Sequence, residues 1–133
     1  MEKTTFDIFW VVLCSGLVFL MQAGFLCLEA GLTRSKNNIN VAVKNLADFS
    51  VTTILFWLFG FAIMFGGIGK IMPNLGADSW TAVFFLFQVM FCGTAVTILS
   101  GAAAERLKFS SYIVIAALVS GLVYPMFGNW AWA

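Results

Sequence analysis

The chain has 133 residues, of which 62% are hydrophobic and only 10% are charged. A soluble domain carries about 25% charged residues and about 45–50% apolar ones, so the composition excludes a soluble globular domain and a disordered chain. A net charge of +1 gives no basic surface for nucleic acid, and the absence of histidine removes the commonest general base and a common metal ligand. The composition therefore predicts an integral membrane protein, or part of one.

The charged residues divide the sequence into four long uncharged stretches, each rich in Leu, Ile, Val, Phe and Ala. A bilayer core of about 30 Å requires roughly 20 helical residues, and helices are expected because a spanning helix satisfies its own backbone hydrogen bonds. We therefore predict one all-α domain, a polytopic transmembrane helix bundle with spans near residues 8–28, 40–67, 79–104 and 109–132. The last uncharged stretch runs to residue 133, and no charged residue or loop follows it. We therefore expect a truncated chain.

Basic residues are distributed unequally between the two sides of this predicted bundle. With four spans, the N-terminus, the second connection and the C-terminus share one side, and the other two connections share the opposite side. The positive-inside rule assigns the more basic side to the cytoplasm, which predicts an N-terminus outside the membrane. The first side holds Lys3 and Lys70, whereas the second holds Arg34, Lys36, Lys44, Arg106 and Lys108.

Aromatic residues in the third span are the first candidate for function. Phe84, Phe87 and Phe91 are spaced three and four residues apart, which places them on one helical face. Packing is the commoner reason for such a stripe. The alternative is an aromatic outer vestibule that attracts a small cation through its ring faces. Trp130 and Trp132 are predicted on the same membrane side, where they belong to such a vestibule or to an ordinary interfacial belt.

Polar residues within the spans are few. Gln22 is interpreted as an inter-helix hydrogen-bonding group. Glu29 and Asp48 are carboxylates near the cytoplasmic ends, where ion pairs, such as Lys44 with Asp48 four residues later, are favoured over a transport role. The three cysteines lie in apolar stretches and are interpreted as packing residues. No phosphate-binding loop, zinc-ligand spacing or catalytic triad is found, so we expect neither an enzyme nor a cofactor.

Three motifs resemble the ammonium transporter (Amt/Mep/Rh) family. The stretch Met21–Asn37 (MQAGFLCLEAGLTRSKN) is similar to the family's first helix and first loop. Phe87–Phe91 (FQVMF), followed by GAAAER at residues 101–106, resembles its third helix and the loop after it. Tyr124–Trp132 (YPMFGNWAW) is similar to the end of its fourth helix. The motifs occur in the family's order over nearly the whole chain.

The resemblance implies a fold of roughly eleven helices per protomer, of which residues 1–133 form the N-terminal part. It also implies a homotrimer in which each protomer has its own pore. By position, Phe91 and Trp132 match the aromatic site that recruits ammonium, and Phe87 and Phe91 match the phenylalanines assigned to the pore gate. The family's paired pore histidines lie downstream of the matched region.

We therefore expect transmembrane transport of ammonium or ammonia by a multi-pass cell-membrane protein embedded in the lipid bilayer, with a cytoplasmic regulator and no nucleic-acid partner. One alternative is an ammonium-sensing membrane domain of a signalling protein. A third hypothesis, a helical membrane protein with a structural role, is disfavoured by the ordered set of motifs.

Overall fold

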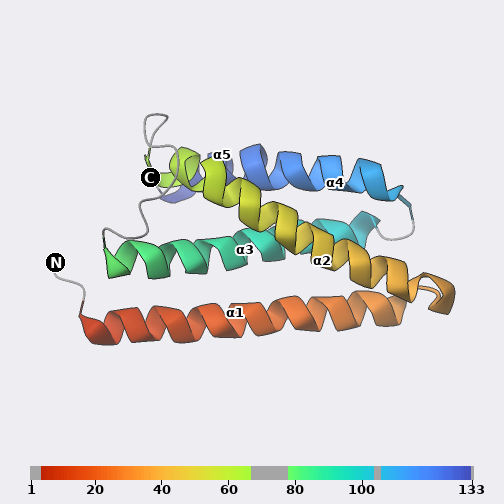
Figure 1. Ribbon diagram of the computed structural model, residues 1–133, viewed down its shortest axis with the longest axis horizontal. Helices are drawn as coiled ribbons and strands as arrows, with labels where there is room; N and C mark the ends of the chain where they lie inside the picture. The colour runs from red at the N-terminus through yellow and green to blue at the C-terminus, as the bar shows by residue number, and fades with distance from the viewer. Residues whose placement is uncertain (1–3, 67–77, 104–105, 133) are drawn as a thin grey trace.

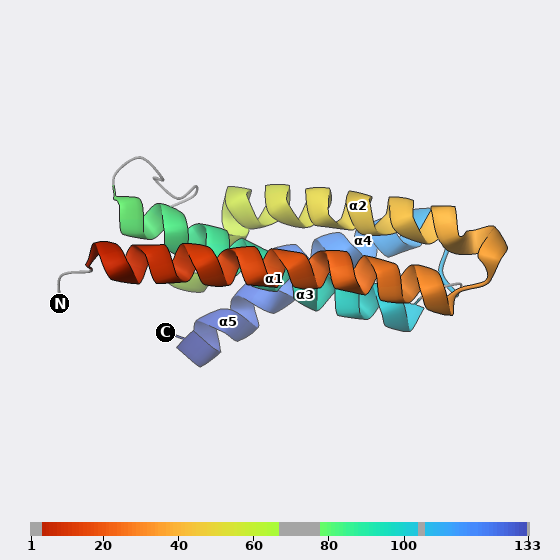
Figure 2. The same ribbon diagram turned by 90° about the horizontal axis from the view of Figure 1, so that it is seen from below.

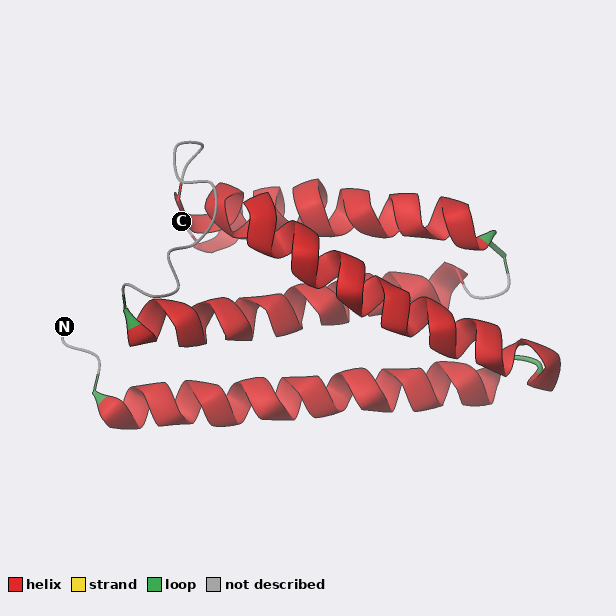
Figure 3. Ribbon diagram, viewed as in Figure 1, coloured by secondary structure: helices red, strands yellow, loops and turns green. Residues whose placement is uncertain are grey.

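In the part of the chain that the structure describes, four helical segments are long and apolar enough to cross a membrane. The computed structural model describes residues 4–66, 78–103 and 106–132, and its regular structure is helical, with no strand among these residues (Figures 1 and 3). The four candidate spans are Thr5–Leu32, Ser35–Gly66, Ser79–Ala103 and Phe109–Trp132. The predicted all-α bundle with four spans is confirmed. Lys3, Lys70 and the predicted span ends at 67 and 104 lie outside the described residues.

Helix α1 (Thr5–Leu32) begins earlier than the start predicted at residue 8. The Thr4 hydroxyl accepts a hydrogen bond from the Asp7 amide at 3.3 Å, and the Asp7 carboxylate accepts one from the Thr4 amide at 2.9 Å. This reciprocal capping box satisfies amides that a helix start otherwise leaves unpaired. A negative side chain in the first turn also interacts favourably with the helix dipole. The charge of Asp7 therefore extends the helix instead of ending it.

The second span contains four helical segments. A short 3₁₀ turn η1 (Ser35–Asn37) leads into helix α2 (Asn38–Leu55), which continues as two π-helical turns, η2 (Phe56–Gly60) and η3 (Ala62–Gly66). A Cβ atom at Gly60 would lie 2.8 Å from the Phe56 ring and 3.3 Å from Pro125. Glycine at this position therefore allows the wide turn to pack against the last span.

The remaining two spans are helix α3 (Ser79–Ala103) and a segment that combines α4 (Phe109–Leu118), the π turn η4 (Val119–Val123) and α5 (Tyr124–Trp132). Pro125 has no backbone N–H to donate, and the π turn η4, which ends two residues before it, accommodates that loss without ending the span. A Cβ atom at Gly121 would lie 2.8 Å from the Phe59 ring, so η4 also packs closely against η2.

Helix α3 lies at the centre of the described bundle. It runs beside α1, while α2 crosses both at an angle and the last span packs against α2 and η2 (Figures 1 and 2). In the most apolar window of each span, 44% of the residues of α3 are buried but only 11% of those of α1. One face of α1 consequently carries exposed apolar side chains, among them Phe9, Leu17 and Leu20.

The two ends of the described chain lie at the same end of the bundle. The start of α1, the start of α3 and the end of α5 are on the left of Figure 1. The turn between α1 and α2 and the start of α4 lie at the opposite end, on the right. The spans therefore alternate in direction, as expected for four successive membrane crossings.

Two apolar clusters fill the bundle. The first is built on Phe56, Met64, Val89 and Cys92, with further aromatic rings packed around it, and the second contains Val96, Tyr112 and Ala116. All three cysteines are free. Cys92 is fully buried, in agreement with a packing role, whereas Cys27 is exposed in the described bundle.

Candidate functional site

Phe87 and Phe91 form an aromatic pair on helix α3. Their ring centroids are 4.8 Å apart and the ring planes meet at 61°, an edge-to-face arrangement that residues one turn apart adopt readily. The Phe91 side chain is 41% exposed. The central helix therefore presents an accessible ring face, which can interact with a cation or form part of a hydrophobic passage.

Phe84 does not extend this pair. Its ring centroid lies 5.0 Å from that of Phe65, at the end of η3, and 6.2 Å from that of Trp80. The predicted stripe of three phenylalanines is therefore divided: Phe84 packs toward the second span, and Phe87 and Phe91 form a separate pair. The packing interpretation holds for Phe84.

Trp132 is the last residue of α5 and is 68% exposed. The end of α5 lies at the end of the bundle where α3 begins (Figures 1 and 2). Among the described residues, no ring contact joins Trp132 to Phe87 or Phe91. The nearby Trp130 packs against Phe127, with ring centroids 6.1 Å apart. The structure thus brings together two of the three predicted site residues, and the recruitment role of Trp132 stays a prediction.

A layer of buried polar side chains joins the first three helices. The Gln22 amide donates to the Thr97 hydroxyl at 2.7 Å, and that hydroxyl lies 3.0 Å from the Gly93 carbonyl and 3.4 Å from the Asp48 carboxylate. The predicted inter-helix role of Gln22 is therefore observed, and its partner is on α3.

The same layer includes Glu29, which is 4% exposed. One carboxylate oxygen, Oε2, accepts from the Asn45 amide at 2.8 Å and from the Ser100 hydroxyl at 3.3 Å. Lys44 donates to the Leu107 carbonyl at 3.1 Å. Hydrogen bonds to neutral groups thus take the place of the ion pair expected between Lys44 and Asp48.

Sequence reasoning missed Asn45, Thr97 and Ser100. A usable signal was present, because Asn45, Asp48 and Thr52 recur at helical spacing along α2, and Thr97 and Ser100 do so along α3. Aligned polar residues on two apolar helices are typical of helices that pack against each other in a membrane.

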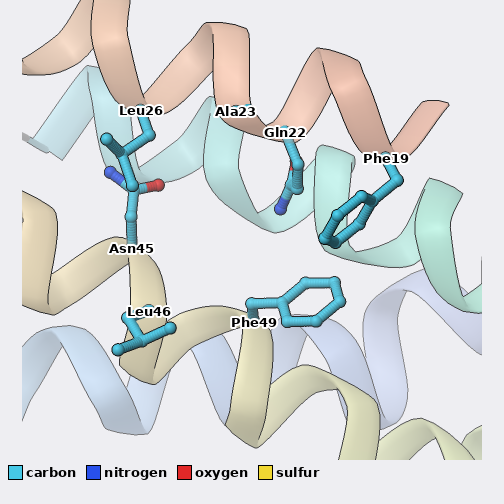
Figure 4. Close-up of a pocket in the computed structure, with 7 residues that line it drawn as sticks. All are labelled: Phe19, Gln22, Ala23, Leu26, Asn45, Leu46 and Phe49. Carbon is cyan, nitrogen blue, oxygen red and sulfur yellow. The ribbon is translucent and has the colours of Figure 1, made fainter. Parts of the chain in front are cut away.

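A cavity of about 300 Å³ lies between α1 and α2 beside this polar layer. Figure 4 shows the Gln22 and Asn45 amides in the space between the two helices, with the Phe19 and Phe49 rings at one end. These rings are 5.8 Å apart in an edge-to-face arrangement. The wall of the cavity is otherwise apolar; its lining residues are Phe19, Gln22, Ala23, Leu26, Asn45, Leu46 and Phe49.

Comparisons with known proteins place these features in a family. The model of the Ammonium Transporter Family matches residues 9–133. A putative ammonium transporter of Synechocystis sp. is 62% identical over 97% of this chain and 25% of its own length. Ammonium transporter Amt2 of Archaeoglobus fulgidus is 45% identical over 95% of this chain and 29% of its own length.

A solved structure, titled Sensor Amt Protein, superposes with a TM-score of 0.84 and 39% identity, covering 94% of this chain and 33% of that one. The chain therefore spans about a quarter to a third of the length of these relatives. Because the family model covers nearly all of its residues, the chain belongs to the ammonium transporter family.

Proposed function

We propose that this chain contributes to the transport of ammonium or ammonia across a membrane. The observation that carries the proposal is the family match over residues 9–133, which includes the central helix with its accessible Phe87–Phe91 pair. The matched relatives are named ammonium transporters. The proposal therefore assigns the same activity to the protein of which these spans form part.

In the proposed mechanism, Phe91 and Trp132 recruit ammonium at the outer end of the bundle. A cation over an aromatic face gains about 0.5–2 kcal/mol, with the larger value where water is excluded, and this gain offsets part of the cost of removing water. Phe87 and Phe91 then form the gate. A water-free passage lined by phenylalanine raises the free energy of any species that keeps its charge. Neutral ammonia therefore crosses it more easily than ammonium.

The proposal extends to the assembly and its setting. We propose that the complete protein is a homotrimer in the cell membrane. Its N-terminus is proposed to lie outside, because more basic residues fall on the opposite side of the bundle. A cytoplasmic regulator is proposed at that opposite side, where Arg34, Lys36, Arg106 and Lys108 supply exposed positive charge. Transport, and no catalytic reaction, is the proposed activity.

Uptake of radiolabelled methylammonium tests the recruitment role. The complete protein is produced in cells that lack their own ammonium transporters, and Trp132→Leu is compared with Trp130→Leu. Trp130 is a matched control, since it lies on the same helix and is 82% exposed. Trp132→Leu should lower uptake at low substrate concentration and have little effect at saturation. A Trp132→Leu uptake curve equal to that of the wild-type protein at all concentrations would disprove the role of Trp132.

The gate is tested with Phe91→Ala and Phe87→Ala. Both should alter the selectivity between methylammonium and potassium, with the amount of folded protein in the membrane unchanged. Phe127→Ala is the control, because this exposed phenylalanine lies outside the pair. Unchanged selectivity in both α3 variants would remove the gate from the proposal.

An ammonium-sensing membrane domain is the second candidate function. It is favoured by the likeness to the solved structure titled Sensor Amt Protein. The two functions differ in flux: a transporter reconstituted in vesicles moves methylammonium across the bilayer, whereas a sensor binds ammonium and moves none. Binding without flux would replace transport by sensing.

A further inference from the structure

Two carboxylates are buried in one polar layer of the bundle. Glu29 on α1 is 4% exposed and Asp48 on α2 is fully buried. Asn45, one turn before Asp48, donates to Glu29, and Ser100 on α3, one turn after the Thr97 hydroxyl that lies 3.4 Å from Asp48, also donates to Glu29. Buried carboxylates within a membrane segment are costly, and they are usually paired or functional.

Several oxygen atoms in this layer are buried without a hydrogen-bond partner. Glu29 receives its hydrogen bonds on Oε2 and Asp48 on Oδ2, whereas Glu29 Oε1 and Asp48 Oδ1 are buried without a hydrogen-bond partner. The Tyr112 hydroxyl belongs to a ring on α4 whose centre lies 5.9 Å from the ammonium of Lys44, the residue one turn before Asp48 on α2. It is also buried without a hydrogen bond of good geometry. Each such oxygen carries a substantial desolvation cost.

Charge is also unbalanced in this part of the bundle. Among the described residues, the buried charged side chains are Glu29, Asp48 and Lys44. The Lys44 ammonium is 3.1 Å from the Leu107 carbonyl and 5.9 Å from the centre of the Tyr112 ring. With both carboxylates ionised, these buried side chains carry one positive and two negative charges, so a single negative charge is left uncompensated.

A water molecule, a proton or a cation bound in this layer could lower the cost of burying these groups. The three differ in whether they contact the unpartnered oxygens, neutralise the negative charge, or do both. A water molecule would satisfy oxygens but leave the charge. A proton on one carboxylate would remove the charge but satisfy few of the unpartnered oxygens. A monovalent cation would do both, because carboxylate and hydroxyl oxygens are the ligands that hard cations prefer. A divalent ion would leave an excess positive charge.

We propose that Glu29, Asp48, Ser100 and Tyr112 form a binding site for a monovalent cation between α1, α2, α3 and α4. The site is separate from the Phe87–Phe91 pair, whose ring–ring contact lies farther along α3 toward its start. The inference does not depend on the proposed transport activity, because the cation here binds within the helix bundle and stabilises it.

Thermal unfolding of the purified complete protein provides the test. The midpoint is measured in choline chloride and then in increasing NaCl, KCl or NH₄Cl at constant total salt, so that only the identity of the cation changes. A ligand that binds only the folded state raises the midpoint with its concentration. At least one of the three cations should therefore raise the midpoint of the wild-type protein. Glu29→Gln and Asp48→Asn should lose this shift, because each removes a charge at nearly constant size.

Two milder variants keep the test valid if a carboxylate substitution prevents folding. Tyr112→Phe removes only the hydroxyl and should reduce the cation-dependent shift. Gly101→Ala would place a Cβ atom 3.2 Å from Glu29 Oε1 and should also reduce it. The matched control is Gly24→Ala, which has no neighbouring atom within 4 Å and should keep the full shift.

Three results would overturn the proposal. A midpoint that is the same in all four salts would favour water alone. A midpoint that responds to pH but to none of the cations would favour a proton. A cation-dependent shift that persists in both carboxylate variants would place the cation elsewhere in the protein.

Discussion

Replacement of the two partners in the Gln22–Thr97 hydrogen bond should have unequal consequences. Gln22→Leu removes one hydrogen bond, which in membrane proteins contributes about 0.6 kcal/mol on average and up to about 1.7 kcal/mol. It also removes Gln22 Oε1, a buried oxygen without a partner. The two effects oppose each other, so we expect Gln22→Leu to cost less than about 1 kcal/mol of unfolding free energy.

Thr97→Val should cost more. The Thr97 hydroxyl accepts from the Gln22 amide at 2.7 Å and lies within donating distance of the Asp48 carboxylate. Its removal leaves a buried amide and a buried carboxylate oxygen without this partner, and an unsatisfied buried group costs about 1–3 kcal/mol. We therefore expect a loss of about 2 kcal/mol or more, although valine matches threonine in shape.

The assay is denaturant-induced unfolding of the complete protein in mixed micelles, for the two single variants and the double variant. The double variant should cost less than the sum of the single ones by about 0.6–1.7 kcal/mol, because Gln22 is no longer left without its partner. The reasoning is refuted if Gln22→Leu costs as much as Thr97→Val, or if the two effects simply add.

The remaining stability predictions use the same unfolding assay. Gly128→Val should cost about 1–3 kcal/mol, because any side chain there would collide with buried Met64; a neutral result would mean that Met64 moves freely. Phe56→Ala should cost about 3–5 kcal/mol, since this ring is fully buried among other aromatic rings; a loss below about 1 kcal/mol would contradict that packing. Thr4→Ala should cost about 0.5–2 kcal/mol by removing the cap of α1, and an unchanged free energy would show that the cap is dispensable.

The sequence was sufficient to predict the four spans, because the bilayer imposes a length and an apolar composition that are visible without any knowledge of packing. The predicted positions of the span ends agree less well with the structure. Asp7 lies just before the predicted start of the first span at residue 8, but in the structure it is inside α1 and caps the helix. The π turns η2 and η4 are also not predicted, since their residues, FWLFG and VSGLV, are types that occur in α-helical spans as well.

The candidate site was predicted only in part. Phe87 and Phe91 are one turn apart, so helical spacing alone indicated their contact. The separate packing of Phe84 depends on Phe65 in a different span, and the bonds of Asn45 and Ser100 to Glu29 depend on how three helices cross. Such contacts between spans follow from crossing geometry, which one sequence does not specify.

The location of both described chain ends at one end of the bundle has a practical consequence. A reporter enzyme or fluorescent protein fused before α1 and one fused after α5 would occupy the same compartment. Fusions in the turn between α1 and α2 would occupy the opposite one. A single pair of fusions, one at an end and one in that turn, therefore measures the orientation of all four crossings at once.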